Sequence, residues 1–187
     1  GHVTMIEAET SLAYHASGRS AALFEQNYGK PSTIALNAAS RDYHFDNDLV
    51  SPRGLMNVGT AQSKDAFAAD QDTMHLRSIS PSEAQAMVPI LNTDVITDVA
   101  WDEHAWDLDT DRMIQGYLKT IRANGGTVHT NAAATAIHRT TTGWTVTTED
   151  QQFDATILIN AAGPWADPIA ELAGIAPLGF TPLRRSM

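Results

Sequence analysis

Residues 155–166 read ATILINAAGPWA, an apolar run that leads into a turn of small residues. The continuous apolar run at 155–159 predicts a strand buried on both faces, as in a parallel sheet. The turn that follows has no large side chain, so a flat ligand could approach its backbone. Tight packing of a strand against the helix expected at about 165–173 would explain the same residues. Either way, this stretch predicts an α/β arrangement.

The composition is that of a folded protein and excludes several function classes. The chain has 187 residues, 43% of them hydrophobic and 18% charged, enough for one domain or parts of two. Its formal net charge of -10 argues against nucleic acid as a partner, because such surfaces are basic. There is no cysteine, which excludes disulfides, thiolate metal sites and a cysteine nucleophile. No apolar run is long enough for a membrane span, and we expect a cytoplasmic protein.

A second stretch of small residues occurs at 15–22, HASGRSAA. We predict a turn here that runs into a helix within 17–28. Small residues let a backbone approach a ligand, and a helix N-terminus attracts phosphate. Arg19 adds positive charge. From these residues alone, an ordinary helix start is an equally good interpretation.

Glu7 ends a strand predicted at 3–7. An acid at the carboxyl end of such a strand is where dinucleotide-binding folds hold the ribose hydroxyls. An ionised carboxylate can accept both hydrogen bonds. On the strand pattern alone, however, a surface glutamate is the favoured interpretation.

The remaining elements mix helices and strands, which indicates an α/β or α+β fold. The best-defined helix is expected between Asp109, its N-cap, and the Asn124-Gly125-Gly126 stop. Its apolar residues fall on one face. The other predicted helices lie at about 31–39, 63–69 and 81–87, and the other strands at about 55–58, 74–79, 134–139, 144–148 and 178–184.

The usual catalytic signatures are absent. There is no G-x-G-x-x-G spacing, phosphate loop, zinc-binding helix or nucleophile elbow. Residues 107–111 begin like a calcium loop, but Arg112 replaces the required glycine and Leu118 the bidentate acid. Asp102-Glu103-His104 could bind a metal, but a surface loop is the favoured interpretation, and the other histidines have no partners at ligand spacing. We therefore predict no metal site and name no catalytic residue.

Taken in order, these segments resemble the D-amino-acid oxidase and glycine oxidase superfamily of FAD-dependent oxidoreductases. The resemblance spans nearly the whole chain. Its specific motifs are SGRSAA at 17–22 and NAAGPW at 160–165. Supporting segments are 6–9, 109–126 and 182–185. The resemblance implies FAD as the cofactor.

The resemblance also implies which residues bind FAD. Glu7 would bind the adenosine ribose with Ala8 beside it, and Ala134, in the strand after Gly126, would meet the adenine. The 17–22 segment would line the pyrophosphate and flavin, and the 160–165 turn would approach the flavin. The implied cofactor-binding residues are Glu7, Ala8, Ser17, Gly18, Arg19, Ser20, Ala21, Ala22, Ala134, Ala162 and Gly163.

The implied activity is oxidation of the C–N bond of an amino acid or secondary amine, with hydride passing to the flavin. Three alternatives stay open. One is an enzyme resembling glycerol-3-phosphate dehydrogenase. Another is a non-catalytic subunit or remnant that acts by partner binding. The third is an NAD-type enzyme that uses an acid like Glu7.

The resemblance predicts an incomplete Rossmann-like FAD-binding domain with part of an α+β substrate domain. The first would comprise 1–79 and 127–176, and the second 80–126 and 177–187. The family's first strand, glycine-rich turn and C-terminal half are not in this sequence. We therefore expect a fragment whose partners include the remaining segments of the same enzyme.

His15 has a separate interpretation. Relatives that oxidise methylated glycines attach flavin covalently through a histidine in a His-Ala-Ala-Gly setting, and residues 15–18 are close to it. The flanking tyrosine and Arg-Ser pair resemble relatives with non-covalent flavin. Non-covalent binding is the expectation.

Overall fold

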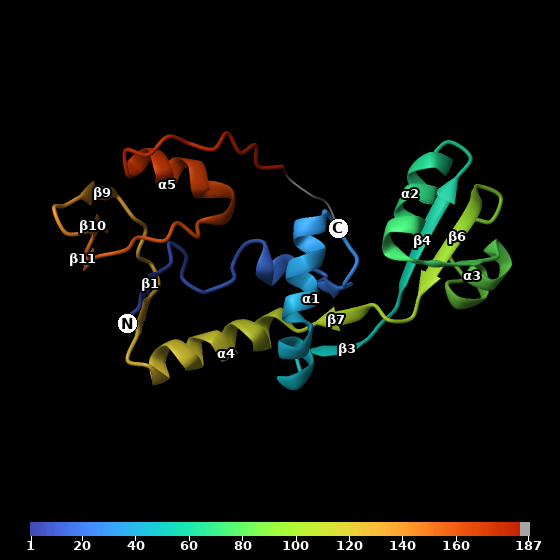
Figure 1. The fold of residues 1–187 in the computed structure, drawn as a ribbon, viewed down its shortest axis with the longest axis horizontal. Helices are drawn as coiled ribbons and strands as arrows, with labels where there is room; N and C mark the ends of the chain where they lie inside the picture. Colours follow the sequence, from blue (N-terminus) through green and yellow to red (C-terminus); the bar gives the residue numbers. More distant parts are fainter. Residues whose placement is uncertain (184–187) are drawn as a thin grey trace. The chain divides into compact units, whose positions relative to one another are not determined.

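The computed structural model describes residues 1–183 and forms two compact units (Figure 1). One unit contains Gly1–Ser20 and the chain from Ile114 onward, and the other contains Ala21–Met113. The predicted division separates an FAD-binding domain (1–79 with 127–176) from a substrate domain (80–126 with 177–187). Its bounds differ from those of the two compact units, and it stays a prediction.

The first unit begins with a parallel strand pair. Strand β1 (Thr4–Ile6) pairs with β8 (Thr127–His129), with Thr4 opposite Thr127. The strand predicted at 3–7 is therefore confirmed, whereas β8 was not predicted. Parallel pairing places the carboxyl ends of both strands at the same edge.

A three-stranded antiparallel sheet follows in the same unit, in the order β11-β10-β9. The strands predicted at 134–139 and 144–148 are confirmed with shorter bounds. The strands are β9 (Ala136–Arg139), β10 (Trp144–Thr147) and β11 (Gln152–Ala155).

The apolar run at 155–159 is not a buried parallel strand, so that prediction is wrong. Strand β11 ends at Ala155, and Ile157 and Ile159 are 75% and 80% exposed. Apolar side chains form a buried strand only when neighbouring strands supply hydrogen bonds and cover both faces. No strand of residues 1–183 pairs with 156–159. The strand predicted at 178–184 is likewise absent over 178–183, and residue 184 lies outside the described residues.

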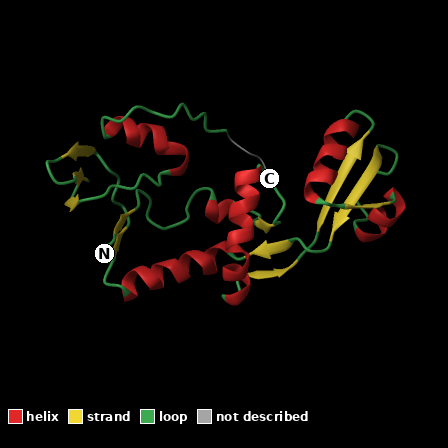
Figure 2. Ribbon diagram, in the orientation of Figure 1, coloured by secondary structure: helices red, strands yellow, loops and turns green. Residues whose placement is uncertain are grey.

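The helix predicted within 17–28 is also wrong. The chain makes one 3-10 turn, η1 (Ser17–Arg19), and is then extended at Ser20. It continues as strand β2 (Leu23–Phe24) of the second unit (Figure 2). Pairing of β2 with β7 satisfies the backbone groups that a helix would have satisfied internally.

The second unit contains two three-stranded sheets. In one, β7 (Trp106–Leu108) lies between β2 and β3 (Val50–Pro52). In the other, β6 (Ile96–Asp102) lies between β4 (Leu55–Thr60) and β5 (Arg77–Ile79), and α2 (Lys64–Met74) lies beside β4 (Figure 1). The core around this second sheet is formed by Phe67, Met74, Leu76 and Ala100.

The predicted helices are confirmed where the sequence carries capping signals. Ser80 and Glu83 form a capping box at the start of α3. Asp109 Oδ1 accepts a hydrogen bond from the Arg112 amide at 2.8 Å at the start of α4. The helices predicted at about 31–39, 63–69 and 165–173 are also present. The five α-helices of residues 1–183 are α1 (Pro31–Asp46), α2, α3 (Pro81–Met87), α4 (Thr110–Ala123) and α5 (Ala166–Leu172). The 3-10 turn η2 (Gly163–Trp165) precedes α5.

Candidate cofactor site

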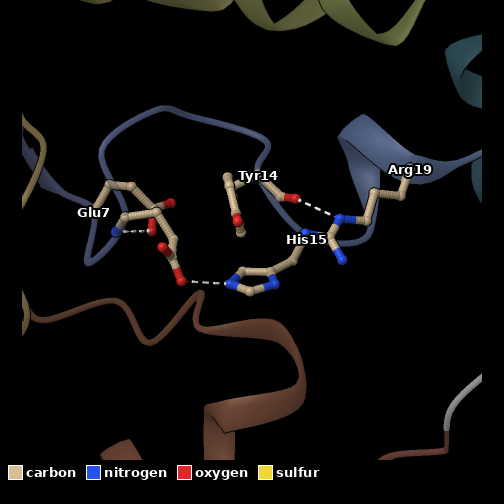
Figure 3. Close-up of polar contacts among 5 residues, drawn as sticks. Glu7, Tyr14, His15 and Arg19 are labelled. Carbon is tan, nitrogen blue, oxygen red and sulfur yellow. Dashed lines mark hydrogen bonds and ion pairs between the residues drawn. The ribbon is translucent and has the colours of Figure 1, made fainter.

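Glu7 lies at the shared carboxyl edge of β1 and β8. Its amide donates to the His129 carbonyl at 2.8 Å, and its carbonyl accepts from the Ala132 amide at 2.8 Å. Its half-buried side chain accepts one hydrogen bond, from the Glu9 amide to Oε1 at 3.0 Å (Figure 3). A carboxylate can accept about four hydrogen bonds. Glu7 is therefore held by its backbone while its carboxylate keeps capacity for a diol.

The loop after Glu9 closes tightly at Gly18. The Gly18 amide donates to the Ala13 carbonyl at 2.8 Å. A β-carbon at Gly18 would lie 2.1 Å from that carbonyl oxygen, so the closure requires glycine. Ala13 itself has a φ of 59°. In this structure, the glycine of the SGRSAA motif is required by the loop's own packing.

The charge of Arg19 is held beside Tyr14. Its Nε donates to the Tyr14 carbonyl at 3.0 Å, and its guanidinium carbon lies 4.9 Å from the Tyr14 ring centroid (Figure 3). The guanidinium stays exposed, as do Ser17 and Ser20. The cation therefore lies on the surface of the loop, where a pyrophosphate could reach it.

His15 joins this loop to the NAAGPW turn. Its Nε2 lies 2.7 Å from Glu9 Oε1, and its ring centroid lies 4.5 Å from that of Trp165. The two rings are inclined at 55°, and Tyr14 packs edge-on against the imidazole at 5.0 Å. The structure thus brings His15, two residues before the SGRSAA motif, against the last residue of the NAAGPW motif.

The NAAGPW turn presents open backbone at Gly163. Asn160 holds the turn, since its Oδ1 accepts from the Ala162 amide at 3.2 Å and its Nδ2 donates to the Ala166 carbonyl at 2.7 Å. Gly163 has a φ of 55°, and no described atom lies within 4 Å of the position of a β-carbon there. Its backbone is therefore accessible to a flat ring.

The other predicted residues have different positions. Ala134 lies in the loop between β8 and β9 and not in a strand, which corrects the predicted strand start. Ala8 lies in the exposed bend after Glu7. Ala21 and Ala22 belong to the second unit, where the Ala22 carbonyl accepts from the Leu108 amide at 3.1 Å.

The contacts of Glu9 with Glu7 and His15 were not predicted from the sequence. The signal for them was an acid two residues after Glu7 and six residues before His15, a spacing that predicts nothing without the loop's path. Within residues 1–183 there is no group of three or more potential metal ligands. The helices of that same range include none long and apolar enough to cross a membrane.

The sequence matches the family of FAD dependent oxidoreductases over residues 1–187, and the chain belongs to this family. Its fold is that of several solved flavoenzymes. L-proline dehydrogenase from P. horikoshii matches with a TM-score of 0.76 and 16% identity, over 93% of this chain and 50% of that one. FAD-bound L-α-glycerophosphate oxidase from Mycoplasma pneumoniae matches with a TM-score of 0.74 and 18% identity, over 92% of this chain and 50% of that one. Glycine oxidase from Geobacillus kaustophilus matches with a TM-score of 0.72 and 14% identity, over 92% of this chain and 52% of that one.

The chain thus spans about half the length of these structures. FAD is the family's cofactor, and three observations within the first unit fit it. Glu7 has acceptor capacity at a strand edge, the Arg19 cation is exposed, and Gly163 offers open backbone.

Proposed function

We propose that the protein containing this chain oxidises the C–N bond of an amino acid or secondary amine. Support comes from the family and from relatives of the same fold that include a glycine oxidase, an L-proline dehydrogenase and the amino acid oxidase NikD. FAD, when bound, supplies the acceptor for the hydride of the substrate carbon. The residues of this chain bind and orient that cofactor.

In this proposal, Glu7 accepts hydrogen bonds from the two ribose hydroxyls, with Ala8 beside it. Ala134 meets the adenine through its backbone. Arg19 neutralises pyrophosphate charge from the part of the 17–22 segment that belongs to the first unit, together with Ser17, Gly18 and Ser20. The flavin ring approaches the backbone at Ala162 and Gly163. The chain's contribution is orientation of the cofactor, and no proton-transferring residue is assigned.

The observation that carries the proposal is the position of Glu7. It stands at the end of paired parallel strands, fixed by two backbone hydrogen bonds of 2.8 Å, with unused acceptor capacity. Glu7→Gln should raise the dissociation constant for FAD about tenfold or more, because an amide loses one acceptor and the charge. Fluorescence titration of the purified protein with FAD measures this constant. Glu149→Gln, an exposed acid of the same unit, is the matched control and should bind FAD as the parent does.

The substrate class is tested by anaerobic mixing. The FAD-loaded protein is mixed with glycine, L- and D-amino acids, N-methyl amino acids or glycerol 3-phosphate, and loss of oxidised flavin absorbance is followed. Bleaching by an amine or amino acid supports the proposal. Bleaching by glycerol 3-phosphate alone, or by none of these compounds, argues against it.

The second candidate function is oxidation of glycerol 3-phosphate. It is favoured by the match to a glycerophosphate oxidase, whose TM-score of 0.74 lies within the range of the amine-oxidising relatives. The same mixing experiment separates the two. A protein that binds no FAD would instead point to the non-catalytic alternative.

A further inference from the structure

Glu9, His15 and Trp165 form a contact that we call the histidine clasp. Glu9 follows the β1 edge, His15 lies in the loop before η1, and Trp165 ends η2. All three belong to the first unit. The three residues are separated in sequence but meet through one imidazole ring. The dashed line at the His15 ring in Figure 3 marks the contact with Glu9.

The imidazole uses two different surfaces. Its Nε2 edge meets Glu9 Oε1 at 2.7 Å, and its ring lies 4.5 Å from the indole ring of Trp165. Because the two contacts use different parts of the ring, neither excludes the other, and one imidazole can hold both partners at once.

Both ends of the clasp are anchored where the cofactor residues lie. The Glu9 amide donates to Glu7 Oε1 at 3.0 Å, and the Glu9 carbonyl accepts from the Asn131 amide at 2.9 Å. Glu9 is thus fixed to the edge that presents Glu7. At the other end, Trp165 lies two residues after Gly163, and its amide donates to the Ala162 carbonyl at 3.0 Å.

We propose that His15 is a positioning residue for FAD. His15 holds the Glu7 edge and the NAAGPW turn in their binding geometry before the cofactor arrives. This inference rests on the proposed cofactor site. A ligand that must order two separate loops loses affinity through the entropy of ordering them. The clasp removes part of that cost, because the loops are already joined.

Two acids and one cation are linked to the His15 ring within the first unit. Glu9 contacts the ring directly, and Glu7 is linked to Glu9 because its carboxylate accepts a hydrogen bond from the Glu9 amide. Arg19 is separated from the imidazole by Tyr14, whose ring both side chains contact.

The first test needs no cofactor. His15→Ala should speed hydrogen exchange at the Glu9 and Trp165 amides of the FAD-free protein, because both segments lose the imidazole that joins them. Mass spectrometry of the exchanged peptides measures the rates. His104→Ala is the matched control, because His104 forms an exposed pair with Glu103 at 3.7 Å in the other unit. The control should exchange as the parent does.

The second test measures FAD affinity. His15→Ala should raise the FAD dissociation constant about tenfold or more, and His15→Gln, which keeps a donor for Glu9, should give an intermediate value. Free imidazole should partly restore binding to His15→Ala. A general loss of structure would not be corrected by imidazole, so rescue separates positioning from folding.

The outcomes distinguish this inference from the proposed function. Unchanged FAD affinity in His15→Ala, or unchanged exchange at the Glu9 and Trp165 amides of that variant, overturns the inference. Failure of the parent protein to bind FAD overturns the proposed cofactor site. Failure to oxidise amines while FAD affinity depends on His15 overturns only the proposed substrate class.

Discussion

The indole ring of Trp101 lies against Gly54, so that a β-carbon on Gly54 would lie 2.1 Å from Trp101 Cη2. Gly54 has a φ of 83°, and its amide donates to the Ala105 carbonyl at 2.8 Å. Both the contact and the backbone conformation exclude a larger residue. Strand β4 thus starts directly after a glycine that the Trp101 ring covers.

Gly54→Ala should therefore lower the free energy of unfolding by about 2–4 kcal/mol, because the indole or the backbone must move. Urea unfolding followed by circular dichroism measures the loss. Gly116→Ala is the control: Gly116 lies inside α4 with open space around it. That substitution should raise stability by about 0.5–1 kcal/mol. Equal effects of the two substitutions would contradict the role of Trp101.

Removing the capping box of α3 should destabilise the second unit. Ser80 Oγ accepts from the Glu83 amide at 3.2 Å, and Glu83 Oε2 accepts from the Ser80 amide at 2.8 Å. Ser80→Ala should cost about 1 kcal/mol in the free energy of unfolding, measured with urea. Ser51→Ala, at an exposed position of β3 in the same unit, is the control for a serine outside the cap. A loss for Ser80→Ala no larger than that for Ser51→Ala would oppose this assignment.

Glu25 should make the protein less stable as pH rises. Burial raises the pKa of Glu25, outweighing the Asn27 and Tyr28 amides that lower it. Its Oε2 is buried without a hydrogen-bond partner among residues 1–183. Since the folded pKa lies above the ordinary value of 4.5, its stabilising contribution is complete below that pH and is lost as pH rises through the folded pKa.

Glu25→Gln removes that titration. The stability of this variant relative to the parent should therefore improve between pH 4 and pH 8. Urea unfolding at both pH values measures the difference. A difference independent of pH would show that the Glu25 carboxyl titrates alike in the folded and unfolded chains.

His44 should have the opposite effect. It packs edge-on against Phe24 at 5.2 Å, and burial lowers its pKa from the ordinary value of 6.5. Its stabilising contribution is present above pH 6.5 and is lost as pH falls through the lowered folded pKa. Thermal unfolding of His44→Gln should show a weaker loss of stability from pH 7 to pH 5 than the parent. A loss of the same size in both would contradict this prediction.

Asp167 should hold the segment after α5 in place. Its carboxylate accepts from the amides of Leu178, Gly179 and Phe180 at 2.8, 2.8 and 2.7 Å. These hydrogen bonds lower the pKa of Asp167 from 3.8, and the bond from the Leu178 amide has the largest effect. The anchor is therefore present above that pH and is lost as pH falls through the lowered pKa.

Asp167→Asn should speed hydrogen exchange at those three amides at neutral pH, because an amide side chain offers one weaker acceptor in place of two charged oxygens. Mass spectrometry of the exchanged peptide measures the rate. Asp150→Asn, in an exposed bend, is the control and should leave the rate unchanged. Equal rates in Asp167→Asn and the parent would remove the anchoring role.

The capped helices could be predicted from sequence because their signals are local. Asp109, the Asn124-Gly125-Gly126 stop and the apolar spacing between them predicted α4, and the structure has it at Thr110–Ala123. Ser80 and Glu83 likewise predicted α3. Capping bonds and apolar periodicity act within a few residues, so no distant contact is needed to recognise them.

The FAD-binding family could also be predicted from sequence, because the two motifs and their order are themselves sequence features. The geometry of the loops could not. The 17–22 segment suggested a helix because its residues favour one, but pairing of β2 with β7 extends the chain instead. Pairing between residues more than 80 positions apart overrides such a preference.

By itself, the sequence determined the capped helices, the hairpin strands β9 and β10, and membership of an FAD-dependent family. Only the tertiary structure decided that Ile157 and Ile159 stay exposed and that His15 joins Glu9 to Trp165. The physical reason is the range of the interactions. Caps and periodic patterns are set by neighbours in the chain, whereas strand partners and side-chain clasps depend on where distant segments meet.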